Sequence, residues 1–159
     1  MDYKELLEGL GKSLGIEDFK LGEDGHCSLA IDDVVVSFGE RPESGRFDMI
    51  AKICELTSDE SGLIYEVLLS AMVPGGSAGD YVFFVDDNLS VYLRWTDVPS
   101  LLDVEGLRQS LERFVNAIED WREEIGNFRR AFPAIDKAAQ RQSDEDRRFA
   151  VNTEGFLQV

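Results

Sequence analysis

The clearest pattern in the chain is an apolar repeat toward its C-terminal end, with alternating spacings of three and four residues. This spacing places the apolar side chains along one stripe of a helix. The stripe covers 25 residues, which is long enough to cross a whole sheet or to follow a partner helix. Pro133 is expected to end this helix, because proline cannot continue it. The stripe contains Val104, Leu107, Leu111, Phe114, Ile118, Trp121, Ile125 and Phe128.

Leucines at helical spacing predict a first helix over residues 2–14. Gly15 directly follows this stretch and is expected to end the helix. Gly9 and Gly11 weaken it, since a glycine inside a helix costs about 1 kcal/mol relative to alanine. Such a weak helix should form only if its apolar stripe packs on the rest of the domain. The stripe contains Leu6, Leu7, Leu10 and Leu14.

A second helix is predicted to begin at Thr57, because Thr57-Ser58-Asp59-Glu60 fits a capping box. Pro74-Gly75-Gly76 is expected to end it. Apolar residues occur nearly all round the circumference of this helix, so we expect it to be buried on two sides. One side carries Leu63, Ile64, Val67, Leu68 and Ala71, and the other carries Tyr65, Leu69 and Met72.

Elsewhere the apolar residues alternate with polar ones, which is typical of strands. The segments between the first two helices are separated by turn-rich tetrapeptides and predict two hairpins in series, followed by a further strand. After the second helix, two more strands are joined by the polar turn Asp86-Asp87-Asn88. The predicted strands are 19–21, 27–31, 34–38, 46–56, 81–85 and 89–95.

Three or four strands precede the second helix, depending on whether residues 19–21 count as a strand. With three, the order is α-β-β-β-α-β-β-α, which predicts an α+β fold, a two-layer sandwich of an antiparallel sheet and helices. A length of 159 residues suits one domain. The composition changes after Pro133, where aromatic and aliphatic residues become sparse. We therefore predict one domain over residues 1–133 and a polar C-terminal tail over residues 134–159, partly helical through residues 139–148.

The chain is strongly acidic, with 16 Lys and Arg against 32 Asp and Glu and a formal net charge of −16. This balance disfavours a nucleic-acid binder, which needs cations to displace the counterions of phosphate. It also disfavours docking on an anionic membrane. The N-terminal residues lack the pattern of a signal peptide, and no apolar run approaches the roughly 20 residues needed to cross a bilayer. We therefore expect a soluble, cytoplasmic protein.

The chain carries few of the side chains that catalysis or metal binding requires. His26 is the only histidine, and its neighbour Cys27 should point to the opposite face of a strand. Cys27 and Cys54 lack the spacing of a zinc site and are expected to be reduced, packed thiols. Adjacent acids are too numerous for one pair to be assigned a catalytic role. We therefore predict no enzyme activity, no catalytic residues, no metal and no cofactor.

The predicted helices present three apolar surfaces: the stripe of the first helix, both sides of the second, and the long C-terminal stripe. One compact domain of this size does not need all three for its core. Surplus apolar faces on a soluble protein usually serve partners or self-association. The sequence therefore favours a protein that works by binding other proteins.

At this point the residues resemble a known family, the class I type III secretion chaperones of the Tir-chaperone (CesT-like) group. Members often carry a Leu-x-x-acid-Gly-x-Cys-x-Leu-x-aliphatic pattern in their first hairpin. Residues 63–72 are similar to the middle helix of the family, and 84–86, 89–93 and 101–121 are similar to its last hairpin and helix. The resemblance covers residues 3–128. The pattern itself stands here as Leu21-Gly22-Glu23-Asp24-Gly25-His26-Cys27-Ser28-Leu29-Ala30-Ile31-Asp32.

Two features depart from the family pattern. The middle helix of the family often ends in Ala-Asn, whereas Met72 follows Ala71 here. The tail after Pro133 is longer than usual, and the resemblance assigns no role to it.

The resemblance implies that this α+β sandwich forms an acidic homodimer in the bacterial cytosol that takes part in virulence and uses no ATP. Such chaperones bind the N-terminal, non-globular segment of a secreted effector and keep it soluble and export-competent. It further implies two sets of contact residues. Leu6, Leu10, Leu14, Phe19, Leu21, Leu29, Ile31, Val34, Val36 and Phe38 are predicted to bind the effector, and Leu63, Tyr65, Leu69, Met72, Tyr92 and Trp95 are predicted to form the twofold interface.

Three alternative functions are also considered. The same scaffold could act as a chaperone-like regulator that sequesters another protein, such as an anti-activator. A net charge of −16 could instead mimic DNA and block a nucleic-acid enzyme, which would require carboxylates arrayed on one face. The weakest alternative is a small enzyme that uses an unrecognised carboxylate pair. The order of the strands and helices favours the effector chaperone.

Overall fold

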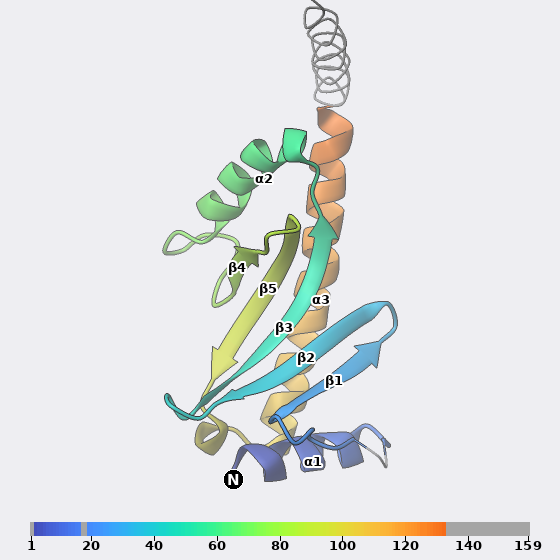
Figure 1. Cartoon of the computed structure of the whole chain (residues 1–159), viewed down its shortest axis with the longest axis vertical. Coiled ribbons are helices and arrows are strands. Elements are labelled where there is room, and N and C mark those ends of the chain that lie inside the picture. Colours follow the sequence, from blue (N-terminus) through green and yellow to red (C-terminus); the bar gives the residue numbers. More distant parts are fainter. Residues whose placement is uncertain (1, 17–18, 133–159) are drawn as a thin grey trace, which may run out of the picture.

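The computed structural model describes residues 2–16 and 19–132 and shows an α+β sandwich (Figure 1). A five-stranded antiparallel sheet carries α3 across one face, and α1 packs on α3 at one end of the sheet. The predicted order of elements is confirmed. The elements are α1 (Tyr3–Ser13), β1 (His26–Ile31), β2 (Val34–Arg41), β3 (Arg46–Glu55), α2 (Ser58–Ala71), β4 (Val82–Val85), β5 (Ser90–Asp97), a short 3-10 helix η1 (Pro99–Leu101) and α3 (Val104–Ala131).

The strands lie in the order β1-β2-β3-β5-β4, so β1 and β4 form the two edges. All four neighbouring pairs are antiparallel. The first of the two predicted hairpins is wrong, because residues 19–21 do not form a strand. A backbone hydrogen bond from the N–H of Gly22 to the carbonyl of His26 (2.8 Å) joins the end of this segment to β1, and Phe19 packs edge-to-face on Phe38 instead.

Alternation along the strands sends every second side chain to the face that α1 and α3 cover. Phe38 on β2, Phe47 and Met49 on β3, and Leu93 on β5 are completely buried there. The long stripe predicted for α3 supplies the opposite side of this core through Leu107, Phe114 and Ile118, among others. The core lies between the sheet and these two helices, and Ile64, Leu68 and Ala71 of α2 extend it at the β4 end.

Two glycines explain why the weak helix α1 is stable where it lies. A Cβ on Gly9 would come within 2.5 Å of Val104 at the start of α3, and a Cβ on Gly11 would come within 2.6 Å of Phe19. The missing side chains let α1 approach its neighbours closely. Packing of the leucine stripe outweighs the low helix propensity of the two glycines.

Arginines on α3 fix this helix to the sheet and to α2. The register of β3 and β5 shifts between Lys52 and Cys54, and such a bulge frees backbone groups from the ladder. Arg122 donates from Nε to the carbonyl of Ile53 and from Nη2 to that of Lys52, both at 3.1 Å. Arg129, about two helical turns further on, binds Glu60 in the first turn of α2.

The predicted helix after Thr57 is confirmed as α2, including its capping box, in which the N–H of Thr57 donates to Glu60 (3.0 Å). The expected burial on two sides is wrong for the protomer. Ile64 and Leu68 are buried, whereas Leu63 and Leu69 on other sides of the helix are exposed. The reason is the position of α2 beside β4 and the end of α3, which leaves part of its surface uncovered (Figure 1).

The predicted tail, residues 134–159, lies outside the described residues. Within the part of the chain that the structure describes, no helix is long and apolar enough to cross a membrane.

Candidate protein-binding surfaces

The outer edge of β1 is the first surface with the properties of a binding site. β1 pairs with β2 on one side only. The bond from Gly22 shows that the backbone groups of His26 point outward, so those of Ser28 and Ala30 point outward as well, because the direction alternates along a strand. Over the described residues, no backbone hydrogen bond from outside the sheet reaches the N–H or C=O groups of Ser28 and Ala30. Such an edge is a template for another strand.

An apolar hollow lies where the end of α1, the end of β1 and α3 meet. Its volume is about 310 Å³, and its apolar lining is Leu14, Ile31, Leu111 and Val115. Leu14 is 39% exposed, and Ile31 ends the open strand β1. The rim is mostly acidic but includes one base. The polar and charged lining residues are Asp32, Arg108, Glu112, Asn116 and Glu119.

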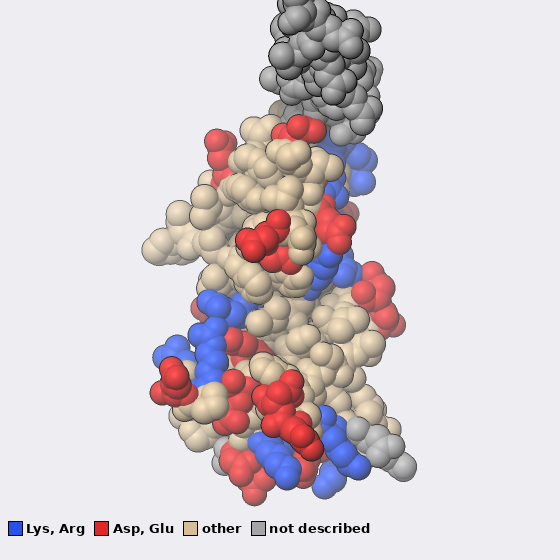
Figure 2. Space-filling model, viewed as in Figure 1, with Lys and Arg blue, Asp and Glu red and all other residues tan. Residues whose placement is uncertain are grey.

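A second apolar surface surrounds the other edge of the sheet. We call it the α2–β4 surface and define it by five exposed side chains on α2, the loop that follows it and β4. Leu69 is 62% exposed, and Phe84 stacks on Tyr92 with ring centroids 5.0 Å apart. Figure 2 shows a largely uncharged area in this region with a few acidic side chains, whereas charged side chains of both signs gather near α1. The surface consists of Leu63, Leu69, Val73, Val82 and Phe84.

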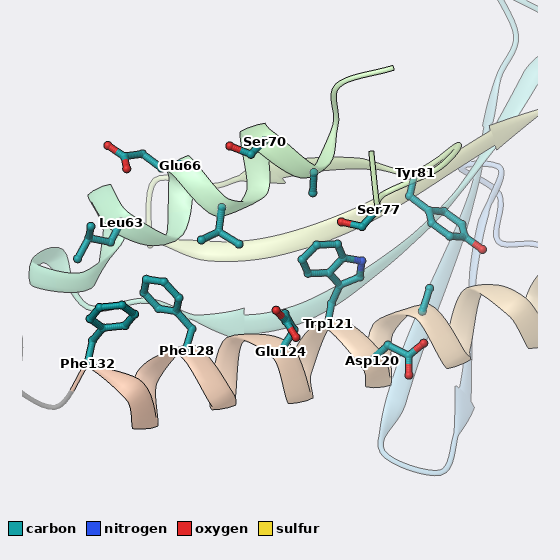
Figure 3. A pocket seen from close by; sticks show the side chains of 13 residues that line it. Leu63, Glu66, Ser70, Ser77, Tyr81, Asp120, Trp121, Glu124, Phe128 and Phe132 are labelled. Carbon is teal, nitrogen blue, oxygen red and sulfur yellow. The ribbon is translucent and has the colours of Figure 1, made fainter. Parts of the chain in front are cut away.

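A third feature, the α2–α3 groove, has a volume of about 990 Å³ (Figure 3). Trp121, Phe128 and Phe132 point from α3 toward α2 and line it. Its charged lining residues are Glu66 on α2 and Asp120 and Glu124 on α3. The groove was not anticipated from the sequence.

The two thiols are poorly suited to chemistry. Burial raises the pKa of Cys27 to about 11 and also raises that of Cys54, so little thiolate exists at neutral pH. Both are free and half-buried. Among the described residues, no group of three or more His, Cys, Asp or Glu is placed to hold a metal ion.

Comparison with known proteins assigns the chain to a family. The model of the Tir chaperone protein (CesT) family matches residues 5–122. The chain belongs to this family. The chaperone class that the resemblance indicated is therefore confirmed. A search of curated protein sequences returned no significant match.

Solved structures share the fold of this CesT-family protein. The ExsC-ExsE complex matches with a TM-score of 0.65 and 23% identity, over 77% of this chain and 96% of that chain. The HopA1-SchA chaperone-effector complex matches with a TM-score of 0.62 and 17% identity, over 76% and 93%. The Yersinia pestis type III secretion chaperone SycH, in complex with a stable fragment of YscM2, matches with a TM-score of 0.59 and 21% identity, over 74% and 98%.

The structure divides the predicted effector-binding residues of this CesT-family protein into two groups. Leu14 and Ile31 line the hollow, and Phe19 and Leu21 are half-buried in the segment that precedes β1. The other six are buried in the protomer core, because they point into the layer between sheet and helices. In this conformation they have almost no surface that a bound segment could touch. These residues are Leu6, Leu10, Leu29, Val34, Val36 and Phe38.

The residues predicted for the twofold interface are also spread over different places. Leu63 and Leu69 belong to the α2–β4 surface, and Tyr65, Met72 and Tyr92 are half-buried beside it. Trp95 lies elsewhere: it points to the core side of β5 and packs edge-to-face on Phe47 at 5.9 Å. Strand alternation puts Tyr92 and Trp95 on opposite faces.

Sequence reasoning missed several residues of these surfaces. Leu111 and Val115 complete the hollow from α3, and Val82 and Phe84 extend the α2–β4 surface along β4. A signal existed for β4, whose residues 82–85 are all apolar, unlike a strand with one solvated face. No comparable signal marked Val115, which adjoins the stripe of α3.

Proposed function

We propose that this CesT-family chaperone binds an extended N-terminal segment of a secreted effector protein in the bacterial cytosol, and keeps that segment soluble and export-competent without ATP. Family membership supports the chaperone class. Among the structures with the same fold, one is a chaperone-effector complex and another contains a type III secretion chaperone. The partner proposed here, an effector protein, is of the same class as the effector in the chaperone-effector complex.

The open edge of β1 beside the apolar hollow is the observation that carries the proposal. An extended segment can add a strand there through the outward backbone groups of Ser28 and Ala30, which requires no particular sequence. An apolar side chain of the same segment can enter the hollow between Leu14 and Ile31. Backbone pairing then supplies affinity and the hollow supplies selectivity.

The functional unit that we propose is a homodimer formed through the α2–β4 surface. Soluble monomers rarely expose large contiguous apolar patches, and a twofold interface buries the same patch on both copies. α2 leaves Leu69 exposed, and Val82 and Phe84 lie exposed on the neighbouring strand β4. We therefore place the twofold axis at this end of the sheet.

Enzyme activity and a cofactor have no part in this function. Its free energy comes from burying apolar surface and pairing backbone groups of a segment that is disordered before binding. The net charge of −16 keeps the chaperone itself soluble despite its apolar surfaces. The proposed domain spans residues 1–133, with residues 134–159 as an appended tail.

One face of the molecule does not fit the DNA-mimic alternative. On the face that Figure 2 shows, acidic side chains are interspersed with Lys and Arg near α1 and are sparse over the largely uncharged area. A mimic of the phosphate backbone needs a continuous acidic array instead. The regulator alternative uses the same surfaces and differs only in the identity of the bound protein.

The first test identifies the partner. The tagged full chain is purified from the cytosol of its native host, the captured protein is identified by mass spectrometry, and the complex is weighed by light scattering. We expect two copies of the chaperone for each copy of a secreted protein, with the protein's N-terminal segment protected from protease. Capture of a nucleic-acid enzyme by a single protomer would contradict the proposal.

The second test addresses the β1 edge directly. Ala30→Pro removes an outward N–H, and proline is tolerated on edge strands whose N–H faces solvent. Ala30→Val is the matched control, because it keeps the N–H at the same position. We expect the proline variant to bind the protected segment at least about fivefold more weakly by calorimetry, and the valine variant to bind normally. Equal affinities would exclude strand addition at β1.

A further inference from the structure

The α2–α3 groove is separate from the β1 edge and offers a differently shaped surface. Its long wall is α3, on which Trp121, Phe128 and Phe132 face α2 (Figure 3). The rings of Phe128 and Phe132 lie 4.7 Å apart, and Trp121 is fixed edge-to-face on Phe83 at 4.8 Å. Val67 forms the facing wall on α2, together with Leu63 at the border that the groove shares with the α2–β4 surface. The stretch from Trp121 to Phe132 spans roughly 16 Å, or three helical turns.

The charged groups that line the groove are all negative. Glu66 lies on the outer side of α2, and Asp120 and Glu124 lie on α3 (Figure 3). The neighbouring bases of α3 are engaged elsewhere: Arg122 binds Asp33 at 2.8 Å and carbonyls of β3, and Arg129 binds Glu60. An apolar floor with an acidic rim is complementary to an apolar stripe flanked by cations.

We propose that the α2–α3 groove binds an amphipathic helix whose apolar stripe is flanked by Lys or Arg. Helices commonly dock in this way, through apolar side chains spaced three and four residues apart. The inference rests on the proposed function, and it gives the bound protein a second attachment point with a defined chemistry. One segment of the effector then binds the β1 edge as a strand, and another binds the groove as a basic amphipathic helix.

A second copy of this chain fits the groove poorly. α2, the helix that a partner protomer would present at this end of the sheet, has Asp59, Glu60 and Glu66 and no base. Inserting it would bring Glu66 of one copy toward the acidic rim of the other, and like charges at an interface cost affinity. The α2–β4 surface, whose exposed side chains are all apolar, carries no such penalty.

The test uses the full chain and three synthetic peptides of about 14 residues, enough for the three turns of the groove. Each has leucines at positions i, i+3, i+4, i+7 and i+11, and the flanking positions are Lys, Gln or Glu. Binding is measured by fluorescence anisotropy of a labelled peptide, with the tryptophan emission of the protein, to which Trp121 contributes, as a second readout. We expect the Lys peptide to bind tightest and the Glu peptide to bind weakest.

Charge-reversal variants locate the site. Glu66→Lys and Glu124→Lys should each weaken binding of the Lys peptide about three- to tenfold. Glu43→Lys is the matched control, because Glu43 is exposed in the β2–β3 loop and the change alters net charge by the same amount. It should leave the affinity within about twofold, since exposed charges beyond a Debye length are screened.

Three results would overturn the proposal: equal binding of the three peptides, an equal loss in the Glu43→Lys variant, or a change of oligomeric state in Glu66→Lys seen by sedimentation. The last would show that a second copy covers the groove. Since the peptides replace the natural client, failure here leaves the Ala30→Pro comparison untouched. If instead the strand-addition proposal fails, the peptide affinities still show whether the groove binds a basic amphipathic helix.

Discussion

The two ends of the sheet differ in how much apolar surface the protomer itself covers. At the β1–β2 end, α1 and α3 enclose the apolar side of the strands, and Leu10, Val36 and Phe38 have no exposed surface. At the β4 end, α2 lies to one side, and Leu69, Val82 and Phe84 remain exposed. The β1–β2 end exposes apolar surface mainly at Val35 and at Leu14 beside the hollow, whereas the β4 end retains a larger group of exposed apolar side chains.

The helices at the two ends are held by different interactions. α1 approaches its neighbours through Gly9 and Gly11 and contributes a stripe of buried leucines. α2 buries fewer side chains, and its first turn is fixed by the ion pair between Glu60 and Arg129. Packing at one end and an ion pair at the other should respond differently to mutation and to pH.

The largest effect is expected for a core truncation at the covered end. Phe38→Ala removes a completely buried ring, and truncations of this kind cost about 3–5 kcal/mol of unfolding free energy. Leu69→Ala, at the exposed end, should cost less than about 0.5 kcal/mol in the protomer. Urea unfolding at low protein concentration measures both. Similar losses for the two variants would show that the ends do not differ in the way described.

Much of the fold could be predicted from the pattern of apolar residues. The unbroken stripe of α3 and the capping box at Thr57 indicated two helices correctly, because strong local signals agreed with the tertiary packing. The segment 19–21 was misread as a strand, since Phe19 and Leu21 alternate as strand residues do. In the structure, contacts of Phe19 with Gly11 and Phe38 determine its position instead.

The binding surfaces were harder to predict than the elements that carry them. Alternation shows which residues share a face, but it does not show whether a helix covers that face. Val36 and Ile31 were therefore predicted together, although Val36 is buried and Ile31 lines the hollow. The α2–α3 groove depends on the angle between two helices distant in sequence, which no local pattern encodes.

A smaller effect is expected at the exposed end, on association and not on folding. Leu69→Asp places a carboxylate in the α2–β4 surface, and burying it in a twofold interface should raise the dimer dissociation constant at least about tenfold. Leu101→Asp is the control, because Leu101 is 77% exposed but lies in η1. Sedimentation at a series of concentrations measures both. Equal weakening of the dimer by the two variants would show that the twofold interface does not lie at the α2–β4 surface.

The smallest effect concerns the ion pair that anchors α2. Glu60 accepts hydrogen bonds from Arg129, at 2.6 and 3.0 Å, and from the N–H of Thr57. Burial acts to raise the pKa of Glu60, but these bonds outweigh it and hold the pKa below its ordinary value of 4.5. Because the folded pKa lies below the unfolded one, the stabilisation is complete above about pH 4.5 and is lost as the pH falls through the folded pKa.

Glu60→Gln measures this contribution. At about pH 7 the variant should lose up to about 1 kcal/mol relative to the wild type, since the pair is only partly shielded from water. At about pH 3 the difference should shrink, because the wild-type carboxyl is then losing its own charge. Hydrogen exchange should show the loss in the amides of α2 and not in those of α1. A pH-independent difference, or one spread equally over both helices, would mean that packing and not the ion pair holds α2, and the contrast between the two ends would then rest on exposed surface alone.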